Sequence, residues 1–339
     1  MILRYCYLSR HPRVFLTMTG LPVGVFDELV RDLLPAYAAA EHARHARPGR
    51  RRAIGGGHPF ALRPRDQILL TVVWLRPYPT QEALGYFCGV SDTGARAVIE
   101  RMLPLLEAAG RDTMRLPDPG RTRRRQADAL LADIPELTVL VDSFEQRVQR
   151  PAVGQQEYDA GKKKAHTVKV QVAVDPETGK IADVSESVPG PTADSTLLER
   201  SGLCTRVPPE GGIGGDKGYA GIDKLHGGGA TPRRKPRGEE DKAYNRAFAR
   251  ERIIVEHGIR RVHRYECLSQ ADRHDRATHT ERTRAVAGLV PFAGNGSASS
   301  AGVTRSHRAL GNVPNMRRNF QLAVLVNRRL DRQQRFRAA

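Results

Sequence analysis

The periodicity of the sequence changes near Leu137, and this change constrains the fold more than any other feature. Between residues 22 and 109, apolar side chains recur at three- and four-residue spacings, which is typical of amphipathic helices. From Leu137 onward the chain carries β-branched runs, and a valine stands at every second position from Val168 to Val174. The sequence therefore predicts a helical region followed by an α/β domain.

The helical region contains a candidate helix-turn-helix at residues 64–109. Thr80 is a candidate N-cap for a short helix that ends at Gly89. Ser91 or Asp92 is then placed to cap the next helix. Two helices joined by a short turn with glycine are the arrangement that puts the second helix into the major groove of DNA. Three packed helices without any DNA contact are the alternative.

Arg96 and Arg101 are expected on the outer side of that second helix, where guanidinium groups reach phosphates or guanine edges. The net charge favours the same partner. The 55 Lys and Arg residues exceed the 37 Asp and Glu residues, so the formal charge is +18, as expected for a protein that binds a polyanion. A general preference for arginine on the surface would give the same composition.

No segment has the pattern of a targeting signal or a membrane span. No apolar run approaches the ~20 residues that a spanning helix needs, and the N-terminus lacks a secretory pattern. The four cysteines form no short pair, which argues against a disulfide scaffold or a cysteine-based zinc site. We therefore expect a cytoplasmic protein without membrane contact.

Composition and periodicity divide the chain into six predicted segments. The basic linker among them contains Arg121, Arg123, Arg124 and Arg125. The segments are a disordered leader (1–20), a helical DNA-binding domain (21–112), the linker (113–136), a catalytic α/β domain (137–290), a low-complexity insertion (291–323) and a basic tail (324–339).

In the α/β region we expect the first and fourth strands to lie side by side, with a long helix packed over their ends. The first strand ends on an acid, Asp142, and the hairpin that follows turns at residues 175–179. The expected order is strand (137–144), hairpin strands (161–188), short helix (194–203), glycine-rich strand end (211–221) and long helix (239–262).

Three acids occupy the ends of these elements: Asp142, Asp216 and Glu256. If they converge, their oxygen atoms suit Mg²⁺ or Mn²⁺ rather than Zn²⁺. Two such ions about 3.5–4 Å apart would activate a water and stabilise the leaving oxygen of a phosphodiester. The alternative is that these are ordinary surface or salt-bridged acids.

Neighbouring residues leave other interpretations open. Asp194 competes with Asp216 for the middle position, and we prefer Asp216 because Asp194 is placed to cap a helix. Lys162, Lys163 and Lys164 are candidates for contacts with backbone phosphates, although a solvated turn explains them equally well. The glycine-rich run GGIGGDKG lacks the order of a P-loop, so nucleotide binding is not expected.

Seven blocks of the sequence also resemble a known family, the insertion-sequence transposases of the DDE class, which are bacterial relatives of the Harbinger-type elements. The resemblance covers residues 19–290. Its blocks, in order, are LRPYPTQEALGYFCGVSDTGARAVIERMLPLLE, VDSFEQRVQRP, GKKKAHTVKVQVAVDPETGKI, VPGPTADSTLLERSGL, GGDKGYAG, PRRKPRG and NRAFARERIIVEHGIRRVHRYECLSQADR.

The resemblance implies a helix-turn-helix domain followed by a ribonuclease-H-like domain with a mixed five-stranded sheet. It implies Mg²⁺- or Mn²⁺-dependent nicking at the ends of a mobile element, and then attack of the freed 3′-hydroxyl on target DNA. The resemblance thus implies that the partner is double-stranded DNA and that the protein forms a homo-oligomer when it synapses the element ends. It also implies a cytoplasmic protein associated with the nucleoid. Asn245 and Arg252 fall where such proteins place helix residues facing the DNA.

By motif, the resemblance implies that Asp142, Asp216 and Glu256 are the catalytic, metal-binding triad, with Asp194 as an auxiliary metal ligand. Two departures bear on activity. The loop after the first strand is compact, and residues 291–323 separate RAVAGLV from the terminal VNRRL, as an insertion or a frame-shifted read-through. A non-catalytic DNA-binding repressor, a decayed copy and a nuclease without strand joining are the alternative functions.

Overall fold

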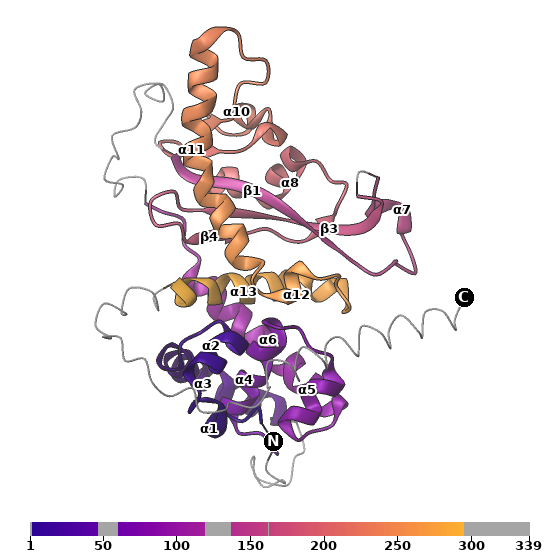
Figure 1. Ribbon diagram of the computed structural model, residues 1–339. Coiled ribbons are helices and arrows are strands. Elements are labelled where there is room, and N and C mark those ends of the chain that lie inside the picture. Colours follow the sequence, from indigo (N-terminus) through magenta and orange to yellow (C-terminus); the bar gives the residue numbers. More distant parts are fainter. Residues whose placement is uncertain (1, 47–59, 119–136, 162, 295–339) are drawn as a thin grey trace, which may run out of the picture. The chain divides into compact units, whose positions relative to one another are not determined.

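The computed structural model divides the chain into two compact units, one up to Met102 and the other from Leu103 to Pro291 (Figure 1). The four linker arginines, Lys162 and nearly all of the expected insertion and tail lie outside the described residues. The structure describes residues 2–46, 60–118, 137–161 and 163–294.

The first unit is helical, as the sequence predicted. The expected caps of the turn are present: the Thr80 hydroxyl accepts a hydrogen bond from the Ala83 amide, and Ser91 Oγ accepts one from the Gly94 amide. Between them Gly89 ends its helix in the left-handed region, at φ 69°. The helices are α1 (Tyr5–Leu8), α2 (Pro12–Thr19), α3 (Val23–His45), α4 (Pro64–Leu75), α5 (Gln81–Cys88) and the start of α6 (Asp92–Thr113).

The first twenty residues are not a disordered leader, so that expectation is wrong. They form α1 and α2, in which Leu8 and Phe15 are fully buried. The Phe15 ring packs edge-on against Phe26 of α3, with ring centroids 5.2 Å apart. Helices of four and eight residues are too short to show the three- and four-residue period by which longer helices are found.

The second unit is a mixed α/β structure built on one twisted sheet (Figure 1). The path of its strands is β2-β3-β1-β6-β7, and β4 and β5 also pair with β3. β1 is antiparallel to β3 and parallel to β6, so the expected adjacency of the first and the glycine-rich strand is confirmed. The strands are β1 (Leu137–Arg147), β2 (Asp159–Ala160), β3 (Ala165–Val174), β4 (Ile181–Val184), β5 (Val188–Pro189), β6 (Gly212–Gly214) and β7 (Gly229–Ala230).

This sheet has seven strands where five were expected, and three of the seven, β2, β5 and β7, pair over only two residues each. Runs that short carry no alternation that a sequence could reveal. The hairpin of β3 and β4 turns through residues 175–179, as predicted.

Helices cover both faces of the sheet. On one face lies the long helix α11 (Gly238–Val262), whose buried Phe248 reaches Gly214 and whose Gly258 lies against Val174. The other face is covered by the segments α8 (Asp194–Ser201), α9 (Leu203–Arg206), η2 (Lys217–Tyr219) and α10 (Ile222–Leu225). Their buried side chains pack with Val141 and Ile213. The remaining helices are α7 (Gln155–Tyr158), α12 (Glu266–Ser269), η3 (Arg276–Thr278) and α13 (His279–Gly294). No helix among the described residues is long and apolar enough to cross a membrane.

A buried polar network joins the far end of β1 to the C-terminal helices. Gln146 of β1 donates to the carbonyl oxygens of Cys267 (2.8 Å) and Gln270 (2.7 Å) and contacts His279 Nε2 at 2.7 Å. Burial lowers the pKa of His279 to about 3, so its ring is neutral at pH 7. Next to it, Arg282 forms a fully buried ion pair with Asp272.

Substituting Arg282 with Met is expected to destabilise the second unit by about 3–5 kcal/mol, because the buried Asp272 carboxylate would lose the positive charge that pairs with it. The double variant Arg282→Met with Asp272→Leu recovers most of that loss, and Arg260→Met at an exposed position leaves stability unchanged. Urea denaturation measures all three. A loss below 1 kcal/mol for the single variant would contradict the role of this ion pair.

Candidate active site

The sequence suggested that Asp142 ends the first strand. In the structure Asp142 lies in the middle of β1, because β1 continues to Arg147. β6 pairs with β1 only as far as Leu140, opposite Gly214. Beyond that point no described strand pairs with β1 on this side until Asp272 donates a hydrogen bond to the Arg147 carbonyl. Alternate side chains of a strand point to opposite faces, so Asp142 and Ser143 leave this stretch of β1 in opposite directions. This gap beside β1 is where acidic side chains gather.

Asp216 follows β6 directly and closes the gap from one side. Its carboxylate accepts a hydrogen bond from the Gly218 amide at 2.8 Å and so caps the short helix η2. A Cβ atom at Gly218 would lie 2.9 Å from Oδ1 of Asp216 and 2.5 Å from Oδ2 of Asp194. The two carboxylates therefore flank the same backbone position, which has no room for a side chain.

Asp194 does not cap a helix, which corrects the reason for ranking it below Asp216. It is the first residue of α8, but no side chain caps that helix. Its Oδ1 instead accepts hydrogen bonds from Ser143 Oγ (2.7 Å) and Lys169 Nζ (3.1 Å) across the sheet. Of the two competing acids, Asp216 is the one that caps a helix, and both lie at the gap.

The three aspartates share one electrostatic environment. Burial raises the pKa of Asp142 above its usual 3.8, and the negative charges of Asp216 and Asp194 raise it further. The Ser143 amide and the Arg252 guanidinium oppose this rise. The pKa of the buried Tyr219 is also well above its ordinary value, first through burial and then through the charges of the same three acids.

The third acid of the expected triad makes no described contact with these aspartates. Glu256 is exposed on α11 and makes no hydrogen bond or ion pair with the described residues. One turn earlier on the same flank of α11, Arg252 places its guanidinium 3.3 Å from Oδ2 of Asp142. The structure thus groups Asp142 with Asp216 and with Asp194, the expected auxiliary acid, and a role for Glu256 beside them stays a prediction.

The charges of Asp194 and Asp216 lie close enough to Asp142 to raise the pKa of its carboxyl. In the part of the chain that the structure describes, no three His, Cys, Asp or Glu side chains are positioned to hold one metal ion. The residues that could contribute oxygen ligands at the gap are Asp142, Asp194 and Asp216, with Glu256 one turn of α11 beyond Arg252.

The expected DNA-contacting residues of the second unit have local partners. Lys163 lies 3.4 Å from Glu145 of β1. Asn245 accepts a hydrogen bond from the Arg233 amide and donates one to the Arg233 carbonyl, which fixes the loop before α11. Lys164 is exposed with a positive φ of 46°. DNA contact by these residues stays a prediction.

In the first unit, Arg96 is well exposed and pairs with Glu100 at 2.7 Å along α6. Arg101 does not point outward as expected. Its side chain is only 17% exposed, donates to Gln67 (3.0 Å) and lies 3.6 Å from Glu41. The difference arises because Arg101 packs back against α3 and α4, which the helical period of α6 alone does not indicate. DNA binding by either arginine is untested.

Sequence reasoning did not single out Ser143 and Lys169, the two residues that hold Asp194. Ser143 directly follows Asp142 in the sequence, where a serine carries no distinctive signal. Lys169 stands between valines in β3, and its side chain is 10% exposed. Lys169 alternates with valines, as does Gln171, so the sequence alone does not separate it from a solvent-facing lysine.

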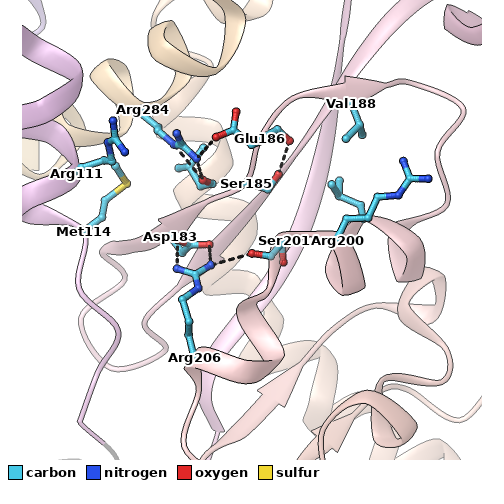
Figure 2. Close-up of a pocket in the computed structure, with 12 residues that line it drawn as sticks. Arg111, Met114, Asp183, Ser185, Glu186, Val188, Arg200, Ser201, Arg206 and Arg284 are labelled. Atoms are coloured by element: carbon cyan, nitrogen blue, oxygen red, sulfur yellow. Dashed lines mark hydrogen bonds and ion pairs between the residues drawn. The ribbon is translucent and has the colours of Figure 1, made fainter. Parts of the chain in front are cut away.

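A cavity of about 410 Å³ lies elsewhere in the second unit, beside β4 (Figure 2). Two of its arginines form ion pairs with acids that also line it. Arg206 binds both oxygens of Asp183, at 2.7 and 2.9 Å. Arg284 pairs with Glu186 at 2.9 Å and donates to the Val184 carbonyl. The cavity contains none of the three clustered aspartates, and its charge pairs connect neighbouring elements.

Two sequence comparisons give similarities to known proteins. Residues 141–290 match the family model described as DDE superfamily endonuclease. The chain is also 28% identical over 284 residues to the probable transposase for insertion sequence element IS702 of Microchaete diplosiphon, covering 83% of this chain and 94% of that protein. The resemblance to DDE-class insertion-sequence transposases is confirmed.

Among solved structures, the chain is similar to the crystal structure of a pre-cleavage Mos1 transpososome. The identity is 12%, the match covers 75% of this chain and 83% of that chain, and the TM-score is 0.18. A TM-score this low does not establish a shared arrangement of elements.

The raised pKa of Asp142 predicts a stability effect with a definite sign. Because the folded-state pKa lies above the ordinary 3.8, the ionised carboxylate destabilises the folded protein once the pH exceeds these values. Asp142→Asn should therefore stabilise the protein at pH 7, by about 0.5–2 kcal/mol. The gain should disappear near pH 3, where the wild-type carboxyl is protonated. Denaturation in chelator-containing buffer at both pH values measures it, and a loss of stability at pH 7 would contradict it.

Proposed function

We propose that the protein is a DNA transposase of an insertion sequence, which nicks the element ends and joins the freed 3′-hydroxyl to target DNA. The observation that carries this proposal is the gathering of Asp142, Asp194 and Asp216 beside β1, within the segment that matches DDE superfamily endonucleases. The sheet order, with an antiparallel β3-β1 pair and a parallel β1-β6-β7 set, supports a ribonuclease-H-like catalytic domain.

The donor set supports a divalent cation as cofactor. Carboxylate oxygens are the ligands that Mg²⁺ and Mn²⁺ prefer, and a bound cation would offset the burial and the nearby negative charges that raise the pKa of Asp142. Asp142, Asp194 and Asp216 would hold the metal. We propose two ions, either Mg²⁺ or Mn²⁺. Glu256 would join them as the third member of the motif. Once bound, the ions would activate water and neutralise charge on the phosphodiester.

Other residues of the site would orient the carboxylates and contact the DNA. Asp216 is held by the Gly218 amide, so its carboxylate keeps one orientation. Arg252 lies beside Asp142, where its guanidinium can also reach a phosphate oxygen. Phosphoryl transfer asks of a protein mainly placement and charge neutralisation, and these side chains supply both.

DNA binding would begin in the first unit, through α5, the Gly89 turn and α6. The formal charge of +18 supports a polyanionic partner, which would be double-stranded DNA at the element ends and at the target. We propose that a homo-oligomer synapses the two ends and that the protein associates with the nucleoid.

A non-catalytic repressor or a decayed copy is the second candidate, favoured by the exposed position of Glu256 away from the aspartates. Such a protein binds element ends without cutting them and is indifferent to metal. A nuclease that cuts but never joins ends is distinguished by the absence of strand-transfer products.

Asp142→Asn and Asp216→Asn are each expected to reduce nicking of a plasmid carrying the element ends by about 10²-fold or more, because each removes a carboxylate that would hold the metal. Binding of the ends should remain. Quantification of nicked and strand-transfer products with Mg²⁺ or Mn²⁺ measures the effect.

Asp223→Asn is the matched control, since Asp223 is exposed on α10 away from the cluster. Undiminished nicking by Asp142→Asn would refute the catalytic assignment. Metal-independent end binding without any nicking by the wild type would favour the repressor.

Arg96→Ala is expected to weaken binding of the element ends about tenfold, because Arg96 is the well-exposed arginine of α6 in the helix-turn-helix segment. Arg31→Ala, at an exposed position of α3, serves as the control. Fluorescence anisotropy at fixed salt concentration measures both. Equal affinities of the two variants would contradict a DNA contact at Arg96.

A further inference from the structure

The two oxygens of Asp194 have different surroundings. Oδ1 accepts hydrogen bonds from Ser143 Oγ at 2.7 Å and from Lys169 Nζ at 3.1 Å. Oδ2 faces the other way, toward Gly218, where a Cβ atom would lie 2.5 Å from it and 2.9 Å from Oδ1 of Asp216. One oxygen is thus bound to the sheet, and the other is directed to the place where the aspartates gather.

Lys169 is itself fixed by several groups. Its ammonium group donates to the Thr192 carbonyl at 2.7 Å and lies 3.8 Å from Oε1 of Glu145. Thr192 belongs to the turn that leads into α8, so one ammonium group holds both the start of this helix and its first acidic side chain. Burying a charged amine is costly unless it is paired and hydrogen-bonded. The Lys169 ammonium group meets this requirement through Asp194, the Thr192 carbonyl and Glu145.

We propose that Ser143 and Lys169 are positioning residues that fix the carboxylate plane of Asp194 and so present Oδ2 as a ligand for a divalent cation. Partners that hydrogen-bond to a ligating side chain set its orientation and strengthen metal binding. This inference rests on the proposed function, because it requires the aspartates to be metal ligands.

Lys169 could also act only through its charge, and this role predicts a different effect of its removal on metal binding. If the ammonium group only offset the charge of the aspartates, it would compete with a bound cation, and its removal would tighten metal binding. If it positions Asp194, its removal weakens binding despite the greater negative charge. The sign of the change therefore separates the two roles. Ser143 carries no charge and tests positioning alone.

The experiment is a Mn²⁺ titration of the full chain, in which the electron paramagnetic resonance signal of free Mn²⁺ reports binding without any reaction. Ser143→Ala and Lys169→Met are each expected to weaken Mn²⁺ binding by about tenfold or more. Ser143→Thr keeps the hydroxyl and should retain wild-type affinity. Lys224→Met, an exposed lysine on α10, should also leave the affinity unchanged.

Unchanged or tighter Mn²⁺ binding in both Ser143→Ala and Lys169→Met overturns the positioning role while leaving the proposed function intact. Failure of the wild type to bind Mn²⁺, or undiminished binding by Asp216→Asn, overturns the proposed metal site and this inference together. If Lys169→Met does not fold, as judged by circular dichroism, the pair Ser143→Ala and Ser143→Thr decides the question.

Discussion

The burial of the Asp142 carboxylate, with two further acids nearby, is the constraint on which the rest of the candidate site depends. β6 stops opposite Leu140, so Asp142 lies beside a gap that Asp216 and Asp194 also border. Like charges held this close raise the free energy of the folded chain unless cations offset them. Arg252 and Lys169 supply positive charge from opposite faces of the sheet. The same fold that creates the repulsion also supplies the groups that orient the acids.

Much of this architecture could be predicted from the sequence. The change from helical period to alternation located the second unit, and the glycine-rich run after residue 211 located the strand that pairs with β1. Caps at Thr80 and Ser91 were predicted because their side-chain chemistry is local. Asp142 and Asp216 were both expected at the site, because strands that lie side by side bring the residues beyond their ends together.

What the sequence could not predict depends on contacts between distant segments. Whether Asp194 caps α8 or turns to Ser143 is decided by packing of α8 against the sheet, and a motif of aspartate, serine and threonine fits both. The inward position of Arg101 depends on Gln67 and Glu41, far away in the sequence. The exposure of Glu256 likewise depends on how α11 crosses the sheet, which no helical period specifies.

The central claim is that Asp142, Asp194 and Asp216 form one cation-binding site. A crystal structure of the protein grown with Mn²⁺, with anomalous diffraction recorded near the manganese edge, tests this claim most directly. The account predicts an anomalous peak bonded to carboxylate oxygens of these aspartates at about 2.1 Å. An anomalous map with no peak between them, or with manganese bound only to other residues, would contradict it.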